Sequence, residues 1–121
     1  MQVQVVDTEQ ALTSLQDVAG VEGSFLVNSA GALAAWNMPS VVEEEILDEA
    51  GAKLARLRQA FAVAGQELDF CTVRFANYKL CLKASEVGII CVLTRPDVNV
   101  AALRMALKII LRQIENRPRS S

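Results

Sequence analysis

Three cysteines are the residues of this sequence that come nearest to nucleophilic or metal-binding chemistry. They are Cys71, Cys81 and Cys91, and the chain contains no histidine. Without histidine, the usual base that activates a catalytic thiol and a very common metal ligand are both missing. All three cysteines fall in stretches expected to form strands, where a buried thiol packs as a small hydrophobic group. We therefore expect no catalytic, cofactor-binding or metal-binding residues, with thiol catalysis as the weaker alternative.

Other groups of residues could serve recognition rather than catalysis. One is acidic (Glu43, Glu44, Glu45, Asp48 and Glu49), and another is a basic row spaced by four (Arg104, Lys108 and Arg112). Each is either a docking patch or the solvated face of a helix, and carboxylates at a helix start also suit the helix dipole. Trp36 either covers the core from an edge strand or anchors a partner. No glycine pattern resembles a phosphate-binding loop, so the chain itself is not expected to be a GTPase.

Composition limits the class of protein. The 121 residues suit a single domain, with a core over 7–114 and a loose tail over 115–121. Hydrophobic residues make up 52%, a surplus that agrees with an oligomer interface, whereas a net charge of −2 and few aromatic residues argue against nucleic acid as a partner. The sequence contains neither a signal-peptide pattern nor an apolar run of membrane-spanning length, so we expect a cytoplasmic protein.

The longest predicted element is a helix from Ser40 to Gly65. Ser40 follows a proline and stands three residues before Glu43, the spacing of a capping box. Gly65 is the expected stop. The helix would span roughly 24 residues, or about 36 Å.

This helix has more apolar surface than one contact requires. A core stripe is expected over Ile46, Ala50, Leu54, Leu57, Phe61 and Ala64, and a second arc over Leu47, Gly51, Ala55 and Ala62, with Arg58 among them. Together they span roughly 200° of the helix, against the ~100° that a surface helix buries. A glycine inside a helix costs about 1 kcal/mol relative to alanine, which the close approach of another backbone would explain. We expect a second copy of the chain to pack on this second arc, the alternative being small residues at half-exposed positions.

Shorter elements surround this helix. The patterns predict a helix of about 12 residues capped by Asp7 or Thr8, and a last helix capped by Asp97 or Asn99 that ends near Ile114. Strands are expected at 24–28, 32–36, 68–75, 79–84 and 89–93, the first two joined by a turn at Ser29-Ala30-Gly31. In the fourth strand Lys79, Cys81 and Lys83 share one face. The fifth is apolar throughout, so helices should cover both faces of the sheet. Tight turns between successive strands predict a mostly antiparallel sheet.

Three stretches, taken in this order, resemble the Roadblock (dynein light-chain) domain family over about residues 7–114. The first runs from Gly20 to Ser24 and continues at Asn28-Ser29-Ala30-Gly31, with Ala30 where the family often has Asp. The second is the long Ala- and Leu-rich helix that starts after a proline. The third is the entry to the last helix, Val98-Asn99-Val100-Ala101-Ala102-Leu103-Arg104. None of these is a catalytic signature.

The resemblance implies an α/β (α+β sandwich) fold with the order α-β-β-α-β-β-β-α. A five-stranded, mostly antiparallel sheet would carry the long helix on one face and the two shorter helices on the other. The resemblance also implies a homodimer in which the long helices pack together and the third strands join, which would protect an otherwise open strand edge. The expected interface consists of Leu47, Gly51, Leu54, Ala55, Arg58, Ala62, Phe70, Thr72 and Arg74.

Members of this family act as platforms for Ras-like small GTPases or as parts of motor and signalling complexes, and some bacterial members activate GTP hydrolysis. The resemblance therefore implies a non-catalytic homodimeric scaffold or regulator that binds such a GTPase or signalling complex. An arginine supplied in trans can speed GTP hydrolysis, but the sequence does not select among Arg58, Arg74 and Arg95. The alternative is a small-molecule-sensing domain of related architecture, and an enzyme is the least favoured class.

Overall fold

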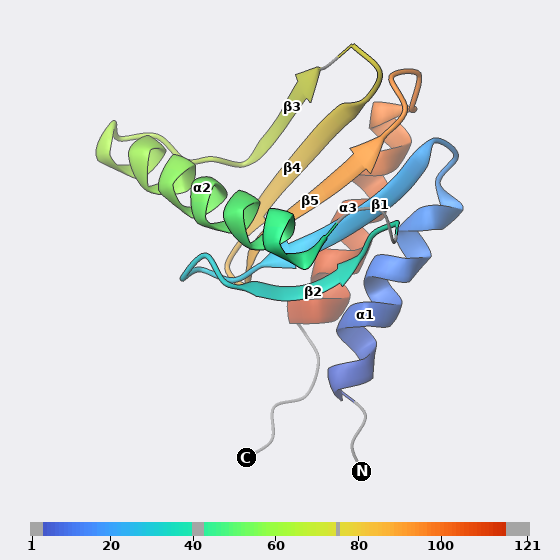
Figure 1. Cartoon of the computed structure of the whole chain (residues 1–121), viewed down its shortest axis with the longest axis horizontal. Coiled ribbons are helices and arrows are strands. Elements are labelled where there is room, and N and C mark those ends of the chain that lie inside the picture. Colours follow the sequence, from blue (N-terminus) through green and yellow to red (C-terminus); the bar gives the residue numbers. More distant parts are fainter. Residues whose placement is uncertain (1–3, 40–42, 75, 116–121) are drawn as a thin grey trace.

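The computed structural model describes residues 4–39, 43–74 and 76–115, and its elements follow the expected order α-β-β-α-β-β-β-α (Figure 1). A short 3-10 turn follows the first helix. The elements are α1 (Gln4–Ser14), η1 (Leu15–Asp17), β1 (Val21–Val27), β2 (Leu33–Asn37), α2 (Glu44–Val63), β3 (Phe70–Arg74), β4 (Lys79–Ser85), β5 (Gly88–Thr94) and α3 (Val100–Glu115).

The strands form one five-stranded sheet in the order β2-β1-β5-β4-β3. Every neighbouring pair is antiparallel, as the tight turns predicted for the pairs that are consecutive in the chain. The all-apolar β5 occupies the centre and is buried almost throughout, which confirms that both faces of the sheet are covered. The outer strands are β2 and β3, so β3 keeps one edge without a strand partner among the described residues.

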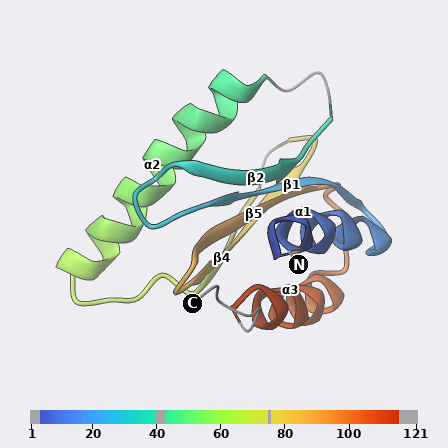
Figure 2. The ribbon, with the colours of Figure 1, turned by 90° about the horizontal axis from the view of Figure 1, so that it is seen from below.

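Side chains that alternate along the strands build a separate core on each face. On one face, Leu26, Cys81 and Ile90 pack against α1 and α3. On the other, Phe25, Leu82 and Cys91 pack in the core to which Leu47 of α2 belongs. Figure 2 shows α1 and α3 side by side on one side of the sheet and α2 alone on the other, which confirms the predicted layers.

The β1–β2 turn has the geometry that its residues predict. The side-chain oxygen Oδ1 of Asn28 accepts hydrogen bonds from the backbone N–H groups of Ala30 (2.9 Å) and Ala32 (3.0 Å). Gly31 has a φ of +89°, a conformation that favours glycine. Asn28 thus holds the turn although Ala30 has no carboxylate to offer.

The helix starts differ from the sequence-based expectations. Helix α1 begins at Gln4, so Asp7 and Thr8, the two residues expected at its start, both lie inside it. Helix α2 begins at Glu44, so Glu43 is its N-cap instead of the third residue of a capping box, and its side chain makes no cap hydrogen bond. The predicted partner, Ser40, lies outside the described residues. Since Glu43 has extended backbone dihedral angles, the helix cannot include it.

The end of α2 and the start of α3 agree with the prediction. After α2, the backbone N–H groups of Gly65 and Gln66 donate to the carbonyls of Ala62 (3.0 Å) and Phe61 (2.8 Å), and Gly65 has a φ of +78°. This is a Schellman ending, in which glycine serves best. At α3, the side chain of Asn99 accepts a hydrogen bond from the N–H of Ala102 at 3.0 Å, so Asn99 is the cap. None of the helices within the described residues is long and apolar enough to cross a bilayer.

Candidate protein interface

Gly51 lies where a backbone approaches α2 closely, but that backbone belongs to the same chain. A Cβ atom at Gly51 would lie 2.9 Å from the carbonyl oxygen of Gly31 and 3.2 Å from a methyl group of Val27. The β1–β2 turn therefore explains why glycine is tolerated in this helix. The close approach that we attributed to a second copy is thus made by the chain's own turn, while a role of Gly51 in an interface stays a prediction.

The same contact fixes which side of α2 meets the sheet. Leu47 is buried in the core, and Ala55 is half-buried with its Cβ beside Gly31. The guanidinium of Arg58 donates a hydrogen bond of 3.5 Å to the carbonyl of Gly88. The arc assigned to a partner thus packs largely on the chain's own sheet, apart from Ala62, which is exposed. Leu54, a member of the predicted core stripe, is half-buried and packs against the same core.

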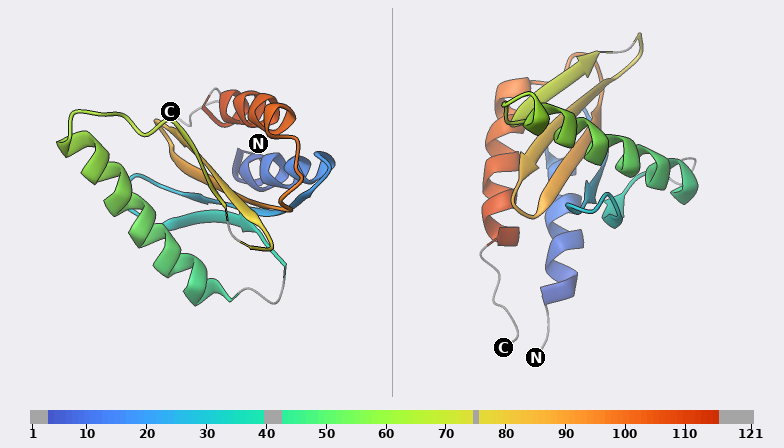
Figure 3. Two further views of the ribbon diagram at one scale, coloured as in Figure 1. Left: turned by 90° about the horizontal axis from the view of Figure 1, so that it is seen from above. Right: turned by 90° about the vertical axis from the view of Figure 1, so that its left-hand side faces the viewer.

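The flank of α2 that was predicted to be the core stripe is instead partly open. Leu57 is 37% exposed, Phe61 is half-buried and Ala64 is exposed. Helix α2 makes its main contacts with β1 and β2, and its course relative to the sheet is seen in the two views of Figure 3. Apolar surface therefore remains on one side of the helix after the chain has folded.

Strand β3 leaves matching apolar surface on the sheet. Val73 pairs with Leu80 of β4, in register with Cys71 and Leu82, which pack on the α2 side of the sheet. Val73 is 39% exposed, whereas Leu80 and Cys71 are half-buried. We name this set the α2-side patch and define it as Leu57, Phe61, Cys71, Val73 and Leu80. The patch adjoins the open edge of β3, so one partner could cover both.

The predicted interface residues of β3 lie on the opposite face of the sheet, the one that α1 and α3 cover. Phe70, Thr72 and Arg74 pair with Lys83, Cys81 and Lys79, and Cys81 belongs to the core under α1 and α3. Phe70 is half-buried, while Thr72 and Arg74 are exposed. If a partner strand paired with the edge of β3, these three side chains would lie beside it on the α3 side of the joined sheet. This follows because the side chains of paired strands alternate between the two faces. The role of all nine predicted interface residues stays a prediction.

The cysteines lie as the packing interpretation expects. Cys81 and Cys91 are buried, Cys71 is half-buried, and none of them forms a disulfide. Burial raises the pKa of the Cys91 thiol to about 12 and also raises the pKa of Cys81. A raised pKa keeps a thiol neutral, which is the opposite of what a nucleophile needs. No group of three or more potential metal ligands occurs in the part of the chain that the structure describes.

The three arginines considered for action in trans lie on separate parts of the molecule. Arg58 is half-buried on α2, Arg74 is exposed at the end of β3, and Arg95 follows β5 with its Nε 3.4 Å from a carboxylate oxygen of Asp97. The structure does not bring these three arginines together.

Trp36 is 43% exposed on β2 and pairs with Phe25, which places it on the α2 side of an edge strand.

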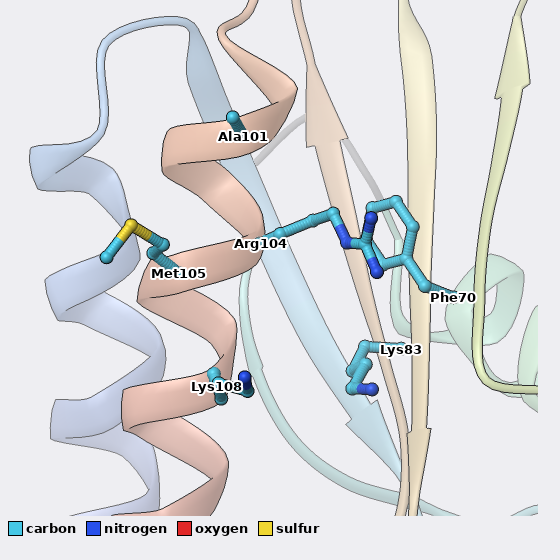
Figure 4. Close-up of a pocket in the computed structure, with 6 residues that line it drawn as sticks. All are labelled: Phe70, Lys83, Ala101, Arg104, Met105 and Lys108. Atoms are coloured by element: carbon cyan, nitrogen blue, oxygen red, sulfur yellow. The ribbon is translucent and has the colours of Figure 1, made fainter.

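Reasoning from the sequence missed the groove between α3 and β4. It is lined by Phe70 and Lys83 of the sheet and by Ala101, Arg104, Met105 and Lys108 of α3 (Figure 4). Lys83 forms an ion pair with Asp69, and the ammonium lowers the pKa of that carboxyl through a hydrogen bond and its charge. The guanidinium of Arg104 lies over the Phe70 ring, 4.7 Å from its centre. The four-residue spacing of α3 and the alternation of β4 were visible, but their adjacency was not.

Comparison with known proteins supports the architecture. No protein-family model matches the sequence, and no curated protein resembles it closely enough to count as a match. Among solved structures, MglB from Myxococcus xanthus aligns with a TM-score of 0.79 at 13% identity, covering 100% of this chain and 98% of that one. A gliding protein MglB from Thermus thermophilus aligns with a TM-score of 0.76 at 12% identity, covering 94% and 90%.

A structure whose fold is named outright also aligns. The Roadblock/LC7 domain from Streptomyces avermitilis superimposes with a TM-score of 0.74 at 16% identity, over 88% of this chain and 93% of that domain. Identities this low carry information about the fold alone. Together with the element order and the layers described above, they establish that this chain has the Roadblock/LC7 fold.

Proposed function

We propose that the chain is a non-catalytic homodimeric scaffold or regulator that binds a Ras-like small GTPase or a signalling complex. The observation that carries the proposal is the α2-side patch beside the open edge of β3. A partner that covers both the apolar patch and the strand edge would have to supply a helix and a strand together. A second copy of this chain can supply both. The resemblance to Roadblock domains, now supported by the fold, points to the same arrangement and to small GTPases as partners.

The proposed dimer differs from the sequence-based expectation in the part of α2 that it uses. The contact would centre on Leu57 and Phe61 instead of Gly51, because Gly51 is occupied by the chain's own turn. The β3 strands of two copies would pair antiparallel, and the α2 helices would pack side by side over the joined sheet. Pairing the β3 edge also removes a strand edge that otherwise invites aggregation.

The dimer can be tested by light scattering on wild type, Leu57→Glu and Val63→Glu. Val63 is a matched control, since it is an apolar residue of the same helix that is 84% exposed. We expect a dimer for wild type and Val63→Glu, and a folded monomer for Leu57→Glu, because a carboxylate buried without a partner opposes association. A wild-type monomer at micromolar concentration would overturn the dimer, as would a Leu57→Glu protein that remains dimeric.

The regulatory role needs a separate test. Small GTPases from the same organism, purified in GDP and GTP-analogue forms, would be measured for binding to the wild-type dimer and for the rate of GTP hydrolysis in its presence. We expect binding that depends on the nucleotide and is lost with Leu57→Glu. A dimer that binds none of these GTPases would leave the scaffold architecture standing and remove the GTPase from the proposal.

Small-molecule sensing gains no specific support. Four hollows among the described residues are surface grooves of about 270 to 400 Å³ with charged or polar side chains in their lining. A sensor needs a ligand held mostly out of water in an apolar pocket.

A further inference from the structure

The groove between α3 and β4 continues along most of the length of α3. Two hollows share Lys83 and Lys108, and the second extends the first toward Arg112. We call this surface the α3 groove and define it by Phe70, Lys83, Arg104, Met105, Lys108 and Arg112. It lies on the face of the sheet opposite the α2-side patch, and Phe70 is the one residue that it shares with the predicted dimer interface.

Positive charge is concentrated at this groove in a chain whose net charge is −2. Arg104, Lys108 and Arg112 form one bank, all of them exposed. On the sheet side, strand register places half-buried Lys79 and Lys83 and exposed Arg74 on the same face as Phe70. Four of the chain's twelve basic residues thus line the groove, and two more lie on the same face of the sheet.

Few acidic groups oppose these cations among the described residues. Asp69 forms an ion pair with Lys83, and Glu86 lines the far end of the groove beside Arg112. Arg104 is held over the ring of Phe70, which orients its guanidinium without neutralising it. Asp69 and Glu86 balance these cations only in part, because the cations that line the groove outnumber the two carboxylates, so we expect a net positive potential along the groove.

Exposed apolar side chains accompany the charges. Met105 is 67% exposed and Ile109 is 56% exposed, one turn apart on α3 and next to the basic row. Isolated exposed apolar residues are normal on a surface. Here two exposed apolar residues lie beside three cations that are spaced by about 6 Å along the helix. Together they form an apolar row and a basic row that both run along the helix axis.

We propose that the α3 groove binds an acidic amphipathic segment of a partner protein. A helix with carboxylates at every fourth residue would place them opposite Arg104, Lys108 and Arg112, while apolar residues one position away would cover Met105 and Ile109. This surface goes beyond the proposed dimer and GTPase contact, and it gives the scaffold a second, electrostatically selected partner.

The shape and composition of the groove favour a protein segment over other anionic partners. Lys83 and Phe70 of the sheet and Arg104 and Lys108 of α3 line a concave surface, which fits a narrow segment better than a flat bilayer. Single-stranded nucleic acid is held by stacking on exposed aromatic rings, and Phe70 is already covered by Arg104. A segment that is narrow and carries both carboxylates and apolar groups uses everything the groove presents.

The test uses the full-length protein and a fluorescent helical peptide of about 20 residues with Glu at every fourth position and Leu next to it. A scrambled peptide of the same composition is the comparison. Binding by anisotropy is expected for the ordered peptide, weakening as salt rises from about 0.05 M to about 0.3 M, since exposed charges are screened over the Debye length. Arg104→Glu with Lys108→Glu should weaken binding at least tenfold (about 1.4 kcal/mol).

A matched variant makes the same change of charge elsewhere. Lys53→Glu with Arg56→Glu alters two exposed cations of α2 and should leave peptide binding unchanged. Arg104→Gln with Lys108→Gln, checked by circular dichroism, covers the case in which charge reversal disturbs folding, and should weaken binding in the same direction. Equal loss in the α2 variant, equal binding of the scrambled peptide, or binding to anionic phospholipid vesicles but not to the peptide would overturn the proposal.

Discussion

At Gly51 two effects of adding a methyl group oppose each other. Alanine favours a helix interior by about 1 kcal/mol over glycine, but its Cβ would lie 2.9 Å from the Gly31 carbonyl oxygen, a backbone atom that cannot turn aside. We predict that Gly51→Ala lowers the free energy of unfolding by about 1–2 kcal/mol, because overpacking of this kind costs more than the propensity gains. Urea denaturation measures the change.

The neighbouring Ala52 provides the control for Gly51. It is exposed on the same helix, so Ala52→Gly reports helix propensity alone and should cost about 1 kcal/mol. If Gly51→Ala instead stabilised the protein by a similar amount, the close approach of the turn to α2 would be wrong.

Cys91 makes stability depend on alkaline pH. Its pKa is raised to about 12 in the folded chain by burial, whereas the usual value is 9.0. The folded state therefore keeps its proton over a pH range in which the unfolded state loses it, so this contribution is complete below pH 9 and is lost as the pH rises toward 12. We predict that the free energy of unfolding falls by roughly 1 kcal/mol for each pH unit above 9.

The measurement compares wild type with Cys91→Ala by urea unfolding between pH 8 and about pH 11. Truncation leaves a small cavity whose cost does not depend on pH, so the difference in stability between the two proteins should shrink as the pH rises. A difference that stays constant over this range would show that the Cys91 thiol ionises equally in both states.

At the scale of elements, the β1–β2 turn links the hairpin to α2. Asn28 accepts two backbone hydrogen bonds, and Gly31 lies against Gly51 and Ala55. We predict that Asn28→Ala lowers the free energy of unfolding by about 1–2 kcal/mol, since two N–H groups lose their acceptor. Ser29→Ala, in the same exposed turn, should change stability by less than about 0.5 kcal/mol. Equal effects in chemical denaturation would contradict the role of Asn28.

The sequence predicted the elements well but not the orientation of α2. An apolar arc of roughly 200° indicates that a helix packs on two surfaces. It does not show which part of the arc packs on the chain's own sheet. That choice depends on where the β1–β2 turn touches Gly51, a contact between residues far apart in the chain. Helix starts were also misplaced, because Asp7 and Glu43 suit a cap and an early helical turn equally well.

The sheet order and the α3 groove likewise depend on contacts between segments that are far apart in the sequence. Tight turns predicted the antiparallel neighbours β1–β2, β3–β4 and β4–β5, whereas the pairing of β1 with β5 joins distant segments and has no local signal. The basic row of α3 and the alternating Lys79 and Lys83 were each seen in the sequence. Only the fold brings the basic row and Lys83 to one groove, so the sequence offered the row as a docking patch but not the concave site that it helps to form.

At the scale of the whole molecule, Cys71 can report on the proposed dimer. Its thiol is half-buried on β3 and belongs to the α2-side patch, while Cys81 and Cys91 are buried in the cores. We predict that alkylation of Cys71 at neutral pH accelerates on dilution, because dissociation uncovers the β3 edge. Mass spectrometry of labelled protein measures the rate.

The Leu57→Glu and Val63→Glu proteins complete this experiment. Cys71 should react at the fast, concentration-independent rate in the first and like wild type in the second. A rate that never changes with concentration in wild type would mean that β3 is not covered by a second copy.

The short outer strand β2 has a consequence for how far such an assembly can grow. Its five residues pair with β1 through a register that shifts between Leu26 and Val27, so this edge is brief and irregular. If β3 joins two copies about a two-fold axis, both ends of the combined sheet are β2 strands, which make poor templates for further chains. The dimer would then be a closed assembly. Its short β2 edges would protect the protein from polymerising into fibres.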